Sequence, residues 1–280
     1  MWSYSRAAVA LLALLPLVAC NRKPAPPATP NVVTITATDY AFQAPDTVPA
    51  GLTTFKFTNQ GQEPHHVVLM GARAEAGKTM ADLDSVMRME GPPPAWLTLP
   101  GSNAVAMPGD SGTVTTTLEA GQYVLVCYIA SPDGQMHVMK GMARPFVVTA
   151  AAAGAVAPPE PQADIVITEK DYDFELSAPL TAGAHTIRVE NAGPQIHEVN
   201  IELLAPGKTL ADFQAWAAGG MKGEPPTRPV GGLIGPDAGK HGWFTVTLVP
   251  GNYLLTCYVP DVQDGKPHVE HGMIKEITVS

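Results

Sequence analysis

The segment GQYVLVCY at residues 121–128 decides the fold class, because it recurs as GNYLLTCY at residues 251–258. A run rich in β-branched and apolar residues leads into each copy, over residues 113–118 and 243–248. Such runs, separated by a glycine-containing turn, are typical of β-strands. Each half of the chain is therefore predicted to contain a pair of strands that ends at a cysteine.

Further segments extend this repeat toward the N-terminus. DYAF at residues 39–42 matches DYDF at 171–174, and GKTMAD at 77–82 matches GKTLAD at 207–212. The offsets between the three matched pairs are 132, 130 and 130 residues. One unit therefore occurs twice. The predicted domains span residues 31–149 and 163–280, joined by an Ala- and Pro-rich linker at residues 150–162.

Strand-like segments dominate both units. The β-branched runs at residues 32–36 and 165–168 open them. Thr79-x-x-Asp82 and Thr209-x-x-Asp212 are capping boxes, which predict one short helix per unit. Several short strands in about 120 residues favour a β-sandwich. We expect an all-β protein of two tandem sandwiches, each with one short helix.

The composition agrees with this fold class. Apolar residues make up 45% of the 280 residues, so each half can bury a core, and 26 Gly and 28 Pro suit many turns. The formal net charge of −9 gives no basic surface for nucleic acid. Nucleic-acid binding is therefore excluded from the expected functions.

Residues 1–20 have the features of a bacterial secretory signal. An apolar run, Ala7 to Leu15, follows Arg6, and LVAC at residues 17–20 resembles a lipobox. That resemblance implies cleavage before Cys20, a lipid on its sulfur, and anchoring to a membrane on the periplasmic or cell-surface side. Residues 21–30 contain four prolines and are predicted to be an extended tether. A plain signal peptide and an uncleaved anchor are the alternatives, although the run is shorter than the ~20 residues that span a bilayer.

One Cys, two His and one Met recur in the same order in both units. Two imidazoles and one thiolate, with a weak thioether, suit copper in both oxidation states, whereas zinc rarely uses Met. His66 aligns with Glu198 and His271 with Lys140, so these histidines are not assigned as ligands. The candidate metal ligands are His65, Cys127, His137 and Met142 in the first unit, and His197, Cys257, His268 and Met273 in the second.

These motifs resemble the plastocyanin/azurin family of cupredoxins. The resemblance rests on Pro-His-x-Val-Val at residues 64–68, on Gly-x-Tyr-x3-Cys, and on His-x4-Met, and it covers nearly all of residues 31–280 outside the linker. It implies Greek-key β-sandwiches and one type 1 copper ion per domain, two per chain, held by the eight residues named above.

Two features depart from the family pattern. The ligand loops, Cys-x9-His-x4-Met and Cys-x10-His-x4-Met, are longer than in plastocyanin and closer in length to the type 1 loop of copper nitrite reductases. His66 and Glu198 stand where the family usually has Asn or Ser, which helps to support the cysteine sulfur. These departures leave the colour and the potential of each site open.

Electron transfer is the expected function, with no catalytic residues and with a cytochrome, oxidase or reductase as redox partner. A copper oxidoreductase is the rival, but such enzymes hold a second copper centre with extra histidines, and a His beside the ligand Cys normally connects the centres. Here Val126, Tyr128, Thr256 and Tyr258 flank the cysteines, and no His-x-His motif occurs. Copper storage, delivery or tolerance is the third possibility, although no Met- or His-rich tract is obvious.

Overall fold

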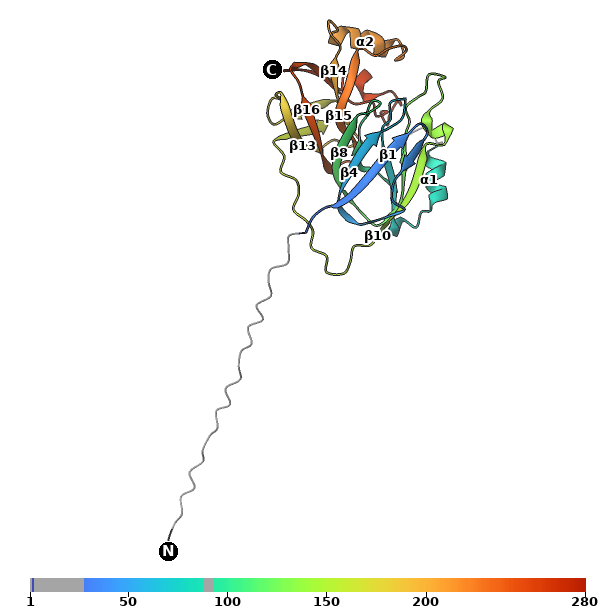
Figure 1. The fold of residues 1–280 in the computed structure, drawn as a ribbon, viewed down its shortest axis with the longest axis vertical. Helices are drawn as coiled ribbons and strands as arrows, with labels where there is room; N and C mark the ends of the chain where they lie inside the picture. Colours follow the sequence, from blue (N-terminus) through green and yellow to red (C-terminus); the bar gives the residue numbers. More distant parts are fainter. Residues whose placement is uncertain (1, 3–27, 88–92) are drawn as a thin grey trace.

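A computed structural model describes residue 2 and residues 28–87 and 93–280 (Figure 1). The predicted signal, Cys20 and most of the tether lie outside the described residues. Among the residues described, no helix has both the length and the apolar character needed to cross a membrane.

The first repeat comprises the following elements: β1 (Asn31–Thr38), β2 (Ala41–Gln43), β3 (Thr47–Pro49), β4 (Gly51–Asn59), β5 (Val68–Arg73), the 3-10 turn η1 (Ala74–Ala76), α1 (Met80–Val86), β6 (Leu97–Thr98), β7 (Pro100–Asn103), β8 (Ser111–Leu118), β9 (Gly121–Val126), the 3-10 turn η2 (His137–Lys140) and β10 (Ala143–Thr149).

The second repeat comprises the following elements: β11 (Ile165–Lys170), β12 (Asp173–Leu176), β13 (Gly183–Asn191), β14 (Val199–Leu204), α2 (Leu210–Ala218), β15 (Thr227–Pro236), β16 (His241–Leu248), β17 (Gly251–Thr256), the 3-10 turn η3 (His268–His271) and β18 (Ile274–Val279).

Both α-helices begin at the predicted capping boxes. The Thr79 backbone N–H donates to Asp82 Oδ2 at 2.8 Å, and the Thr79 hydroxyl accepts the Asp82 N–H. Thr209 and Asp212 repeat this arrangement at the start of α2. The prediction of one short helix per unit is thus confirmed, within a fold that is otherwise built of strands.

Two layers of strands enclose the core of each repeat. In the first, β2, β1, β4 and β8 form one layer and β3, β10, β9, β5 and β6 form the other. In the second, β12, β11, β13 and β16 face β18, β17, β14 and β15. Alternation fixes the faces, because Val33, Ile35 and Ala37 of β1 point into the core while their neighbours are less buried. The predicted all-β class with two sandwich units is confirmed.

The two repeats are joined more closely than a tandem arrangement suggests. Strands β8 and β16 pair, so one eight-stranded sheet runs through both repeats (Figure 1). Strand β7 of the first repeat also adds to the second repeat's sheet by pairing with β15. The pairs Val114–Phe244 and Asn103–Leu233 join positions that are equivalent in the repeat. The repeats therefore meet about a local pseudo-twofold axis, as in a symmetric dimer.

Side chains also cross this junction. Val114 of the first repeat belongs to the second repeat's core, and Ile234 of the second lies in a cluster built around Val68 and Val124 of the first. Asp237 accepts hydrogen bonds from the Thr98 hydroxyl at 2.7 Å and from the Leu99 N–H at 3.0 Å. The two sandwiches therefore share part of their apolar packing.

Candidate metal centres

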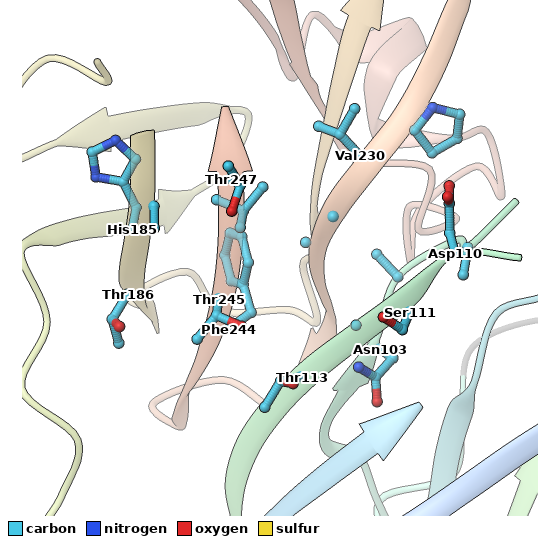
Figure 2. A pocket seen from close by; sticks show the side chains of 18 of the residues that line it. Asn103, Asp110, Ser111, Thr113, His185, Thr186, Val230, Phe244, Thr245 and Thr247 are labelled. Carbon is cyan, nitrogen blue, oxygen red and sulfur yellow. The ribbon is translucent and has the colours of Figure 1, made fainter. Parts of the chain in front are cut away.

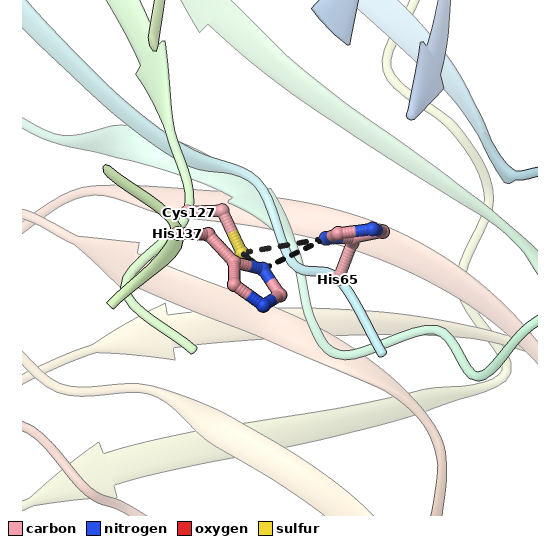
Figure 3. Close-up of side chains that lie close together, drawn as sticks. All are labelled: His65, Cys127 and His137. Carbon is pink, nitrogen blue, oxygen red and sulfur yellow. Dashed lines mark hydrogen bonds between the residues drawn. The ribbon is translucent and has the colours of Figure 1, made fainter. Parts of the chain in front are cut away.

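The first cluster forms where three segments meet at one end of the first sandwich. His65 lies between β4 and β5 and is fixed by two backbone hydrogen bonds with Ala106, of 3.1 and 2.8 Å. Cys127 follows directly on β9, and His137 begins η2. The side chains of His65, Cys127 and His137 point toward one another (Figure 3).

The donor atoms of this cluster surround one point. The Nδ1 atoms of His65 and His137 lie 3.0 Å apart, and Cys127 Sγ lies 3.9 and 3.4 Å from them, respectively (Figure 3). All three side chains have no exposed surface. Metal–N and metal–S bonds of about 2.0 and 2.3 Å in a trigonal plane would place N and N about 3.5 Å apart, and N and S about 3.7 Å. The observed separations between the donor atoms are close to these values, so the cluster fits a metal ion with bonds of about these lengths.

Carboxylates hold the outer edges of both imidazole rings. Asp39 Oδ1 lies 3.2 Å from His65 Nε2, and Glu63 Oε2 lies 2.9 Å from His137 Nε2. Because a carboxylate only accepts, each Nε2 must carry the hydrogen of a neutral ring, and both Nδ1 atoms are then bare acceptors. Two lone pairs facing each other at 3.0 Å repel unless a cation lies between them. This contact is the strongest structural indication of a metal site.

The second cluster repeats the first. The Nδ1 atoms of His197 and His268 lie 3.1 Å apart, and Cys257 Sγ lies 3.3 Å from His268 Nδ1. Asp171 Oδ1 holds His197 Nε2 at 2.6 Å, as Asp39 holds His65. These three donors are also fully buried. The same donor set is thus assembled twice.

Burial controls the protonation of these donors. Desolvation raises the pKa of the Cys127 thiol to about 11 and that of Cys257 well above its ordinary value. Desolvation likewise lowers the pKa of His65 and His197, and lowers that of His268 to about 4. His65, His197 and His268 are therefore neutral at pH 7, and a thiolate would form only with a compensating cation.

The two predicted methionine ligands are buried next to these clusters. Met142 N–H donates to His137 O at 2.9 Å, and Met142 O accepts the Cys127 N–H at 3.3 Å. Met273 makes the equivalent bonds to His268 and Cys257, at 3.0 and 3.3 Å. Both methionines have no exposed surface. Backbone bonds thus tie each methionine to the other two members of its ligand loop.

His66 and Glu198, the departures from the family pattern, occupy equivalent structural positions. The Tyr128 N–H donates to His66 Nε2 at 2.8 Å, and the Tyr258 N–H donates to Glu198 Oε1 at 3.0 Å. Each side chain therefore links the segment of the first histidine to the residue after the cysteine. Neither belongs to a donor cluster.

The unmatched histidines have other partners. The His185 side chain is only 8% exposed, and its Nδ1 lies 2.5 Å from Asp164 Oδ2. His241 contacts Glu160 at 3.2 Å, and His271 contacts Asp264 at 3.1 Å.

A large groove lies apart from both clusters. It has a volume of about 980 Å³ and opens where β8 and β16 diverge beyond their short pairing (Figure 2). Its lining includes Asn103, Ser111, Thr245 and Thr247, and it contains none of the clustered Cys and His residues. The groove is a feature of the junction between the repeats.

The carboxylates around the histidines could not be recognised as a group from the sequence. Asp39 and Asp171 were visible only as part of the repeated DY segment. Glu63 and Asp261 give no local signal, because they stand at different positions of the repeat.

No protein-family model matches the chain, and no curated protein matches it. Among solved structures, a dithionite-reduced auracyanin from Roseiflexus castenholzii is 26% identical, with 44% of this chain and 98% of that one covered and a TM-score of 0.29. Auracyanin A, a "blue" copper protein from Chloroflexus aurantiacus, is 20% identical, with 43% and 100% covered and a TM-score of 0.30. A blue copper oxidase from Nitrosomonas europaea is 16% identical, with 90% and 86% covered and a TM-score of 0.28.

Proposed function

We propose that the chain is a cupredoxin of two domains that transfers single electrons through two mononuclear type 1 copper sites, one in each domain. The observation that carries the proposal is the pair of buried His–Cys–His clusters, each with its Nδ1 atoms facing inward. Copper, when bound, supplies a one-electron couple that this donor set suits in both oxidation states.

The protein's part is to hold the donors still and to exclude water. The Val138 N–H donates to Cys127 O at 2.8 Å, and the His137 N–H donates to Ile129 O at 2.8 Å. The second ligand loop has the same bonds, from Val269 to Cys257 and from His268 to Val259. A ligand set fixed in this way changes little when an electron arrives, and little rearrangement favours fast transfer.

A carrier is favoured over an oxidoreductase by the residues near the clusters. The neighbours of the cysteines are Val126 and Tyr128, and Thr256 and Tyr258, so no His connects either site to another centre. In residues 28–87 and 93–280, a third group of possible donors contains only one His, His271, with Asp261 and Asp264. This group therefore does not contain the several histidines that a second copper centre needs.

The test uses the copper-loaded full chain. We expect stopped-flow mixing with a reduced small cytochrome to show two electrons accepted per chain, with no turnover of nitrite or dioxygen at about 1 per second or faster. Enzyme-like turnover would contradict the carrier function. Rapid loss of copper to a competing chelator, with slow electron transfer, would instead favour copper delivery or storage.

We also propose that the chain is anchored outside the bacterial cytoplasm through a lipid on Cys20, where it meets a cytochrome, oxidase or reductase. The support is the LVAC segment at residues 17–20 and the prolines that follow it. Cys20→Ser should release the protein from the membrane fraction. Unchanged retention would contradict the lipid anchor.

A further inference from the structure

One difference between the surroundings of the two clusters is the position of a single carboxylate. Glu63 of the first domain is replaced by Gln195 in the second, and Ser131 is replaced by Asp261. Each domain thus keeps one carboxylate of this pair, and that carboxylate accepts the hydroxyl of the tyrosine that both repeats share, Tyr40 or Tyr172.

In the first domain the carboxylate is bonded directly to a ligand ring. Glu63 Oε2 lies 2.9 Å from His137 Nε2, while Glu63 Oε1 accepts the Tyr40 hydroxyl at 2.7 Å. The Ser131 hydroxyl donates to Tyr40 Oη at 3.2 Å and completes the chain of hydrogen bonds. One carboxylate oxygen is therefore left to His137.

In the second domain the carboxylate is engaged elsewhere. Asp261 Oδ2 accepts the Tyr172 hydroxyl at 2.6 Å and the Gln195 side-chain N–H at 3.0 Å, and Oδ1 accepts the Gln263 N–H at 2.7 Å. His268 Nε2 lies 3.7 Å from Asp261 Oδ2, which is too far for a hydrogen bond. This nitrogen is buried and has no hydrogen-bond partner among the residues that the structure describes.

We propose that Glu63 is a positioning residue that lowers the reduction potential of the first site, and that Gln195 leaves the second site without this effect. This inference rests on the proposed electron-transfer function. A carboxylate that accepts the outer N–H of a ligand histidine fixes the ring and makes its other nitrogen a stronger donor. A stronger donor stabilises Cu(II) more than Cu(I), so the interaction contributes to moving an electron from the first site to the second.

The two sites also differ in residues that this mechanism does not involve. The second has the buried acids Glu169 and Glu198, where the first has Ala37 and His66. The test must therefore change only the exchanged pair and compare each site with itself. The double variants Glu63→Gln/Ser131→Asp and Gln195→Glu/Asp261→Ser do this, and neither changes the net charge.

The experiment is spectroelectrochemical titration of the copper-loaded full chain, in which each site takes up one electron from an added reductant and no bond breaks. Glu63→Gln/Ser131→Asp should increase the equilibrium constant for reduction of the first site about tenfold. This corresponds to a rise of about 59 mV in its one-electron reduction potential. Gln195→Glu/Asp261→Ser should lower the second site's potential by a similar factor. The single variant Glu63→Gln, close to isosteric, should also raise the first.

Tyr40→Phe is the matched control, because it removes the bond to Glu63 Oε1 and leaves the bond to His137. It should shift the first site's potential by less than either change at Glu63. Unchanged potentials in both exchange variants, or shifts of the opposite sign, would overturn this inference while leaving electron transfer in place. Absence of any reversible one-electron couple in the unmodified protein would refute the proposed function, and this inference with it.

Discussion

Replacing Glu169 with Ala should stabilise the protein at alkaline pH. Glu169 lies on β11 with no exposed surface, and neither of its carboxyl oxygens has a hydrogen-bond partner among the described residues. The equivalent position in the first domain is Ala37, which is also fully buried. The substitution therefore gives the second domain a residue that this fold already accepts at that position.

The sign of the effect follows from the pKa of this carboxyl. Burial, and then the nearby Glu198, raise the pKa of Glu169 well above its ordinary value of 4.5. A carboxyl whose pKa is raised in the folded chain favours folding below its unfolded pKa, and that advantage is lost as the pH rises through the folded pKa. Burying a polar group without a partner costs about 1–3 kcal/mol. Glu169→Ala should recover about 1–2 kcal/mol at pH 8, because the lost side-chain packing offsets part of the gain.

Urea denaturation of the full chain at pH 5 and pH 8 measures this effect. The midpoint of Glu169→Ala should exceed that of the unmodified protein, and by more at pH 8. The reverse substitution, Ala37→Glu, should destabilise the protein with the same pH dependence. A Glu169→Ala variant that is less stable at pH 8 would refute the reasoning, since it would mean that the carboxylate is satisfied in the folded protein.

Two further predictions concern the junction and the independence of the sites. Asp237→Ala leaves the Thr98 hydroxyl and the Leu99 N–H without their acceptor, which should cost about 2–4 kcal/mol. Urea unfolding should then shift to lower concentration for both domains together, and a shift confined to one domain would show that the shared sheet does not couple them. Cys127→Ser should abolish the first site's visible band and spare the second, and Cys257→Ser should do the reverse, because each cluster takes its donors from one repeat. Loss of both bands in either variant would contradict this.

The parts of the fold that could be predicted from the sequence depend on local signals. The β-branched runs became strands, and each helix begins at its Thr-x-x-Asp box because the capping hydrogen bonds join residues three apart. The pairing of β8 with β16, and of β7 with β15, could not be predicted in this way. Strand order between repeats depends on which edges remain open after each sandwich has formed, and no short segment carries that information.

The candidate ligands were predictable because they recur in order, whereas their surroundings were not. The sequence shows DY at both Asp39 and Asp171 but does not reveal that these carboxylates face the first histidine of each cluster. Glu63 and Asp261 were harder still. They are not equivalent in the repeat. Only the folded chain shows that Glu63 contacts Tyr40 and that Asp261 contacts the equivalent tyrosine, Tyr172.

The copper content and visible spectrum of the purified full chain test the central claim most directly. The inward-facing Nδ1 pairs and buried cysteines predict two copper ions per chain, one for each cluster, with intense thiolate-to-Cu(II) absorption that disappears on reduction. One copper ion in a fully loaded protein would mean that one repeat has kept its donors without binding metal. Zinc in place of copper, with no visible band, would contradict the assignment of electron transfer.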